Sequence, residues 1–112
     1  MKLWIALLLL IPTLTFSQSY KDGLVVIQFS ADFVKTHEVD IGELKEIELI
    51  RLYLTKHPKI FKKEEIKYLP TVVLYHNGKT IVRIESDISL QLPDNTLEEL
   101  QSHINTIVKQ KF

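Results

Sequence analysis

Histidine is the side chain of this sequence with the widest range of chemistry, and one of the four histidines stands among acids. His37 is followed by Glu38 and by Asp40. An imidazole beside carboxylates can act as a general acid or base, or supply half of a metal site. The remaining histidines lack the spacing of metal ligands and are spread along the chain, at His57, His76 and His103. We therefore interpret His37 as a solvated loop residue, with acid–base catalysis through Asp32 or Glu38 as the alternative.

Other reactive groups are missing from the sequence. It contains no cysteine, which excludes thiol–disulfide exchange, cysteine nucleophiles and cysteine-bound zinc, because each of these needs a sulfur atom. Only three glycines occur, too few for a glycine-rich loop that cradles phosphate. No pair of catalytic acids and no Ser-His-Asp arrangement is apparent. We expect no cofactor, no metal and no enzymatic activity.

Lysines gather in one short segment of the chain. They are Lys56, Lys59, Lys62, Lys63 and Lys67. Such a cluster can bind an anionic partner, but Glu64 and Glu65 interrupt it, which favours a solvated helix face. The whole chain carries 14 basic and 14 acidic residues, so no basic excess indicates nucleic acid binding.

The N-terminus has the pattern of a secretory signal peptide. Lys2 precedes an apolar run from Leu3 to Ile11, and Pro12 and a stretch of small and polar residues follow. Thr15 and Ser17 provide the small side chains for cleavage before Gln18. The run is shorter than the roughly 20 residues of a transmembrane helix. We predict a signal peptide at 1–17 and an exported domain at 18–112, periplasmic or secreted, without stable membrane insertion after cleavage. An uncleaved anchor is the alternative.

In residues 18–112, apolar runs and turn signals predict alternating strands and helices. Strands are expected at 24–29, 48–54, 72–75 and 80–84. Helices are expected at 40–43, at 59–66 after Pro58, and from Thr96 to the C-terminus, where Glu99 would complete a capping box. Asn77-Gly78 predicts a tight hairpin. These elements predict an α/β domain with a mixed four-stranded sheet, in which three strands are of the parallel type and the last is antiparallel.

Three segments resemble the thioredoxin family, and together they extend from Gly23 to the C-terminus. The most specific is Leu69–Lys79, which is similar to the family's Ile-Pro-Thr signature with its apolar strand, aromatic residue and Gly-Lys turn. Gln28–Phe33 and Leu52–Pro58 resemble two further strand ends of the family. The resemblance implies a thioredoxin-like fold in which the bond before Pro70 is cis.

The resemblance also shows which parts of the family's chemistry are absent. Its Trp-Cys-Gly-Pro-Cys-Lys segment falls on Phe33–Glu38, with Val34 at the nucleophilic and His37 at the resolving cysteine position. Gln28 stands where the family often keeps a buried acid. The segment that follows is short, so the first helix is expected to be truncated or lost. A thiol–disulfide oxidoreductase is therefore excluded.

A binding role is the function that this comparison implies. In relatives, the backbone before the cis-proline pairs with an extended substrate, a mode that needs no sulfur. We predict that a peptide or partner protein binds at Phe33, Val34, His37, Leu69, Pro70 and Thr71. The alternatives are a structural domain that self-associates through a sheet edge or the short-helix face, and a non-redox enzyme using His37. The oligomeric state stays open.

Overall fold

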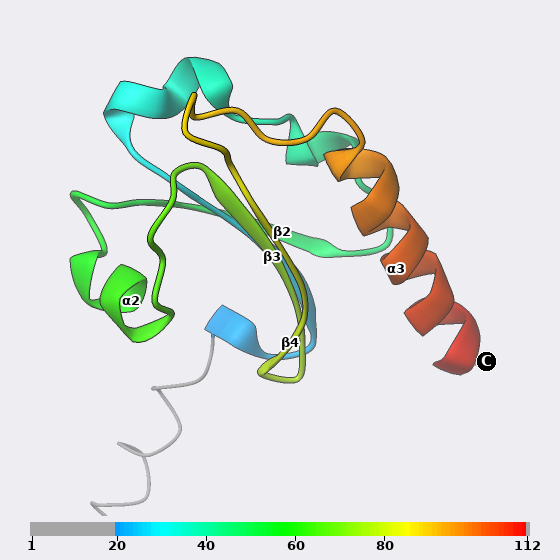
Figure 1. Ribbon diagram of the computed structural model, residues 1–112. Coiled ribbons are helices and arrows are strands. Elements are labelled where there is room, and N and C mark those ends of the chain that lie inside the picture. The colour runs from blue at the N-terminus through cyan, green and yellow to red at the C-terminus, as the bar shows by residue number, and fades with distance from the viewer. Residues whose placement is uncertain (1–19, 112) are drawn as a thin grey trace, which may run out of the picture.

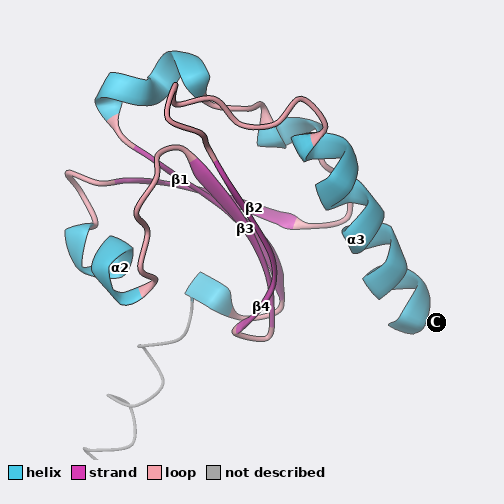
Figure 2. Cartoon of the chain, viewed as in Figure 1, coloured by secondary structure: helices cyan, strands magenta, loops and turns pink. Residues whose placement is uncertain are grey.

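The computed structural model describes residues 20–111, so the predicted signal peptide at 1–17 lies outside the described residues. Residues 20–111 contain four strands and two α-helices, which Figures 1 and 2 show together with short 3-10 turns. They are β1 (Leu24–Ser30), β2 (Glu48–Tyr53), α2 (Pro58–Lys63), β3 (Thr71–His76), β4 (Lys79–Glu85) and α3 (Thr96–Lys111). Within residues 20–111, no helix has the length and apolar character needed to cross a membrane.

The strands form one mixed sheet in the order β2-β1-β3-β4. Only β1 and β2 are parallel, whereas β3 runs antiparallel to β1 and β4 antiparallel to β3. The mixed four-stranded sheet is confirmed, but the prediction of three parallel strands is wrong. Because β2 is parallel to β1 and β3 is antiparallel to it, the chain enters β3 at the end of the sheet where it left β2. The six-residue α2 lies in this connection.

Helices cover both faces of the sheet, because the central strands are apolar on both sides. In β1, Val25, Ile27 and Phe29 point to a cluster that contains Phe61 of α2. Val26 points to the opposite cluster, which contains Leu100 and Ile104 of α3 together with side chains from β3 and β4. Figure 1 shows α2 and α3 on opposite sides of the sheet. This arrangement explains why β1 is a continuous apolar run rather than an alternating one.

The predicted hairpin turn is present in the structure, whereas the predicted capping box of α3 is not. Asn77 and Gly78 have φ values of 52° and 84°, as the tight turn between β3 and β4 requires. The predicted capping box of α3 is wrong. Thr96 is already the first helical residue, and its hydroxyl donates to the carbonyl of Pro93 at 2.6 Å.

The segment between β1 and β2 contains no α-helix. Two short 3-10 turns, Asp32–His37 and Ile41–Glu43, take its place. The second turn is capped by Asp40, whose carboxylate accepts the N–H of Gly42 at 3.1 Å. The expected loss of the first helix is thus what the structure shows. Irregular backbone therefore lies directly beside the predicted binding surface.

Candidate functional site

Three chain segments meet at one end of the sheet. The register pairs Phe29 of β1 with Thr71 of β3, and Thr71 with Glu85 of β4. The end of β1, the start of β3 and the end of β4 are therefore neighbours. An open groove of about 310 Å³ lies there, lined by Phe33, Lys67, Tyr68, Leu69, Ser86, Asp87, Ile88 and Leu90.

Apolar side chains stand exposed around this groove. Phe33 is 70% exposed, Tyr68 47% and Ile88 99%. Five large apolar side chains are exposed among the described residues, and these three line the same groove. A hollow of about 690 Å³ adjoins it and shares Tyr68 and Ile88. Large apolar groups gathered at one place on a surface indicate a binding site, whereas scattered ones need no explanation.

The loop that carries Ile88 is held in a fixed shape by Asp87. One carboxylate oxygen of Asp87 accepts the N–H of Ser89 at 2.9 Å, the Ser89 hydroxyl at 2.7 Å and the N–H of Gln91 at 3.1 Å. These hydrogen bonds, the Ser89 hydroxyl first, hold the pKa of Asp87 below its usual range. Leu90 has a φ of 66°, a conformation that costs about 1–2 kcal/mol in an L-residue. The loop thus presents Ile88 in a defined position.

Three of the six predicted site residues lie beneath the groove rather than in it. Val34 and Thr71 have no exposed surface, and Pro70 is buried as well. The side chain of Val34 therefore packs in the core and cannot contact a partner. The Leu69–Pro70 peptide bond is cis. The structure brings Phe33 and Leu69 together in the groove, above these buried residues.

The backbone of Leu69 is available for pairing. Within residues 20–111, neither its N–H nor its C=O takes part in a hydrogen bond. The next carbonyl along, that of Pro70, already accepts the N–H of Ser86 at 3.2 Å. An extended peptide in the groove would thus find one free donor and one free acceptor on Leu69.

His37 lies apart from the groove. It is half-buried and lines a smaller hollow together with Thr36, Val39, Gln91 and Leu92. Among the described residues, no interaction joins His37 to Asp32 or Glu38, because Asp32 pairs with Lys35 and Glu38 is bonded elsewhere. The acid–base pair that the sequence suggested is not formed. No group of three potential metal ligands occurs within residues 20–111 either.

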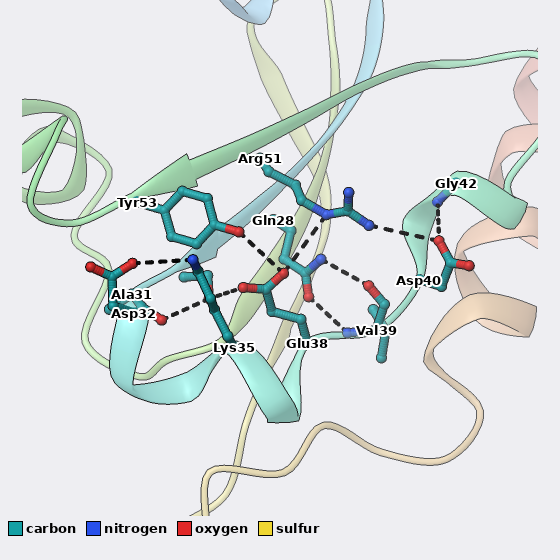
Figure 3. A network of polar contacts seen from close by, with 11 residues as sticks. Gln28, Ala31, Asp32, Lys35, Glu38, Val39, Asp40, Gly42, Arg51 and Tyr53 are labelled. Atoms are coloured by element: carbon teal, nitrogen blue, oxygen red, sulfur yellow. Dashed lines mark hydrogen bonds and ion pairs between the residues drawn. The ribbon is translucent and has the colours of Figure 1, made fainter.

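A network of polar contacts joins the irregular segment between β1 and β2 to the sheet (Figure 3). The buried amide of Gln28 accepts the N–H of Val39 and donates to its C=O, both at 3.0 Å. Glu38 accepts the hydroxyl of Ser30 at 2.7 Å and lies 3.8 Å from the guanidinium of Arg51. Gln28, at the position where the resemblance places a buried acid, thus has a structural partner and satisfies both backbone groups of Val39.

Two parts of the groove are not among the residues predicted for the binding surface. They are Tyr68 and the loop that follows β4, from Ser86 onward. Asp87-Ile88-Ser89 carries one usable signal, because an Asp two residues before a Ser favours a side-chain-bonded turn, which leaves the intervening Ile exposed. That this loop folds toward Phe33 depends on strand register, which local sequence does not specify.

Comparison with known proteins supports the fold alone. No family profile matches the sequence, and no curated protein matches it either. Solved structures that resemble it include the oxidised thioredoxin of Plasmodium falciparum, with a TM-score of 0.56, 19% identity, and coverage of 74% of this chain and 82% of that one. Another is the thioredoxin of Fasciola hepatica, with a TM-score of 0.57, 18% identity, and coverage of 76% and 84%.

A third similar structure is the thioredoxin of Malassezia sympodialis, with a TM-score of 0.55, 20% identity, and coverage of 80% of both chains. Identities at this level establish architecture and leave function open. Thiol–disulfide exchange requires a thiol, and this chain has no cysteine. The chain therefore has a thioredoxin-like fold and no cysteine.

Proposed function

We propose that this domain binds an extended segment of a protein or peptide in the groove between Phe33, Tyr68, Leu69 and Ile88. The observation that carries the proposal is the gathering of exposed apolar side chains at this one groove. Phe33, Tyr68 and Ile88 come from three separate segments, so no single helix or strand accounts for their common exposure.

The chemistry of the groove defines the occupant. An apolar side chain of the peptide would lie between Phe33 and Ile88, where it removes apolar surface from water. The peptide backbone would pair with the free N–H and C=O of Leu69, as in β-augmentation. Lys67 and Asp87 at the rim offer one charge of each sign to flanking residues. We place this activity outside the cytoplasm, because residues 1–17 have the pattern of a signal peptide.

The test is a selection of binders from a random peptide library displayed on phage, followed by titration of the selected peptides. Phe33→Ser and Ile88→Ser are expected to weaken binding by about 10-fold or more, because each removes an apolar contact of about 1.5–3 kcal/mol. Both side chains are exposed, so circular dichroism should show an unchanged fold. The matched control is Ile81→Ser, an exposed apolar residue of β4 that does not line the groove.

Self-association is the second candidate, and the sheet order is the observation that favours it. Within residues 20–111, β2 and β4 each pair on one side only, so one edge of each strand has no partner there. Analytical sedimentation tests this candidate. If dimers persist in Phe33→Ser and Ile88→Ser, and if neither change weakens any selected peptide, the interface is a sheet edge and not the groove.

A further inference from the structure

The lysine cluster between Lys56 and Lys67 forms a more uniform surface than its sequence suggests. In the sequence, Glu64 and Glu65 interrupt the run of positive charge. In the structure, the Glu64 side chain is only 9% exposed, whereas all five lysines are exposed. Glu65 is therefore the one exposed acid of this segment.

The side chain of Glu64 points inward, and its negative charge is compensated by neighbouring donors. Its carboxylate accepts the hydroxyl of Tyr20 at 2.7 Å and that of Tyr75 at 3.1 Å, and it pairs with the ammonium of Lys21 at 3.0 Å. Burial alone would raise the pKa of Glu64, but these donors outweigh it and hold the pKa below its usual value. The negative charge of Glu64 is thus compensated on the inner side of α2.

Helical geometry puts three of the five lysines on one side of α2. Lys59, Lys62 and Lys63 are spaced by three and four residues, so their side chains share the outer face of α2. Phe61 packs on the opposite face, in the core below the sheet. Lys56 lies just before the helix and Lys67 beyond it, at the rim of the groove. No ion pair within residues 20–111 uses any of these five lysines.

We propose that this lysine face, made of Lys56, Lys59, Lys62, Lys63 and Lys67, rests on a membrane surface that carries anionic phospholipids. Clusters of about four to eight basic residues bind such surfaces, and each contributes about 1 kcal/mol near the headgroups. The face consists of lysines, which are mobile point charges, and lacks the bidentate arginines that fix a nucleic acid backbone.

The point where the chain enters the fold supports a membrane over other polyanions. Tyr20 is bonded to Glu64, directly after the last residue of α2, and Figure 1 shows the first described residues beside this helix. The apolar run Leu3–Ile11 ends nine positions before Tyr20, a length of chain that spans at most about 30 Å. The chain therefore joins the domain next to α2, on the inner side of the helix that carries Lys59, Lys62 and Lys63. An uncleaved N-terminal anchor, the alternative to the signal peptide, would hold this helix near a membrane.

The test is co-sedimentation of the full chain with vesicles of phosphatidylcholine, with and without phosphatidylglycerol. The apolar N-terminal run is common to both mixtures, so the ratio of the two partition coefficients reports the charge effect. The triple variant Lys56→Gln, Lys59→Gln, Lys63→Gln should lower this ratio by about 100-fold, a factor of about five for each lysine. The matched control replaces the exposed Lys45, Lys79 and Lys109 by Gln and should retain most of the ratio. High salt should abolish the preference in the unmodified protein.

Three results would overturn the proposal: no preference for phosphatidylglycerol, an equal loss in both triple variants, or binding to duplex DNA at least as tight as to the vesicles. Circular dichroism separates an unfolded variant from one that has lost binding, and the salt dependence of the unmodified protein tests the proposal without any variant. Ile88→Ser should bind vesicles normally, so this proposal and the groove can fail independently.

Discussion

Two glutamates organise opposite sides of the sheet, and their surroundings differ. Glu64 lies at the end of α2 and has three donors within 3.1 Å, two of them tyrosines of the apolar interior. Glu38 lies in the irregular segment, with one close donor, Ser30 at 2.7 Å, and two longer contacts, to Tyr53 at 3.5 Å and Arg51 at 3.8 Å. Arg51 is itself 44% exposed.

This difference suggests that the two sides have different tasks. The α2 side is tied together by short charged hydrogen bonds in a mostly dry setting, where such bonds are strong. On the other side, two of the three contacts of Glu38, which lies between the short turns that replace a helix, are 3.5 Å or longer. A binding surface needs exposed side chains on positioned loops, whereas a scaffold needs close packing. The loss of a helix beside the groove is compatible with a binding surface, whereas it would weaken a scaffold.

The largest effect is expected at Val34, because it is the point where the groove side meets the core. Val34→Glu places a carboxylate in a site with no exposed surface, which should cost about 3–5 kcal/mol. In a domain of this size the native state should be largely lost. Chemical denaturation followed by circular dichroism measures this. A stable, folded Val34→Glu variant would show that the groove side is less well packed than the structure indicates.

Removal of the charge should destabilise the fold more at Glu64 than at Glu38. Glu64→Gln leaves Lys21 without its counterion and should lower the free energy of unfolding by about 2–3 kcal/mol. Glu38→Gln should cost only about 1 kcal/mol, because its partner Arg51 is solvated. Denaturation of both variants under the same conditions tests the order. Equal losses would mean that the two networks are equivalent.

The smallest expected effect is on how stability changes with pH, through the carboxylate of Glu64. The pKa of Glu64 is lowered in the fold from an ordinary value of 4.5, so its contribution to stability is complete above that pH. The contribution is lost as the pH falls through the lower, folded pKa. Stability measured between neutral and acidic pH should therefore decline less steeply in Glu64→Gln than in the unmodified protein. Parallel pH profiles would contradict the assignment of this carboxylate as a charged anchor.

The sequence by itself determined the four strands, the hairpin and the missing chemistry, but not the strand directions. Apolar runs specify buried strands through local side-chain type, and Asn77-Gly78 specifies a turn through its backbone freedom. The absence of cysteine excludes thiol exchange in any fold. Of the surface predicted from the resemblance, Phe33 and Leu69 line the groove.

Only the tertiary structure decided which of the candidate residues are accessible. Val34 and Thr71 are buried and Phe33 is exposed, although all three lie in segments that were assigned to one surface. Ile88 reaches the groove through strand register, and Glu64 leaves the lysine face by turning toward Tyr20 and Tyr75. The reason is physical: exposure and pairing depend on contacts between residues far apart in the chain, and local patterns carry no information about them.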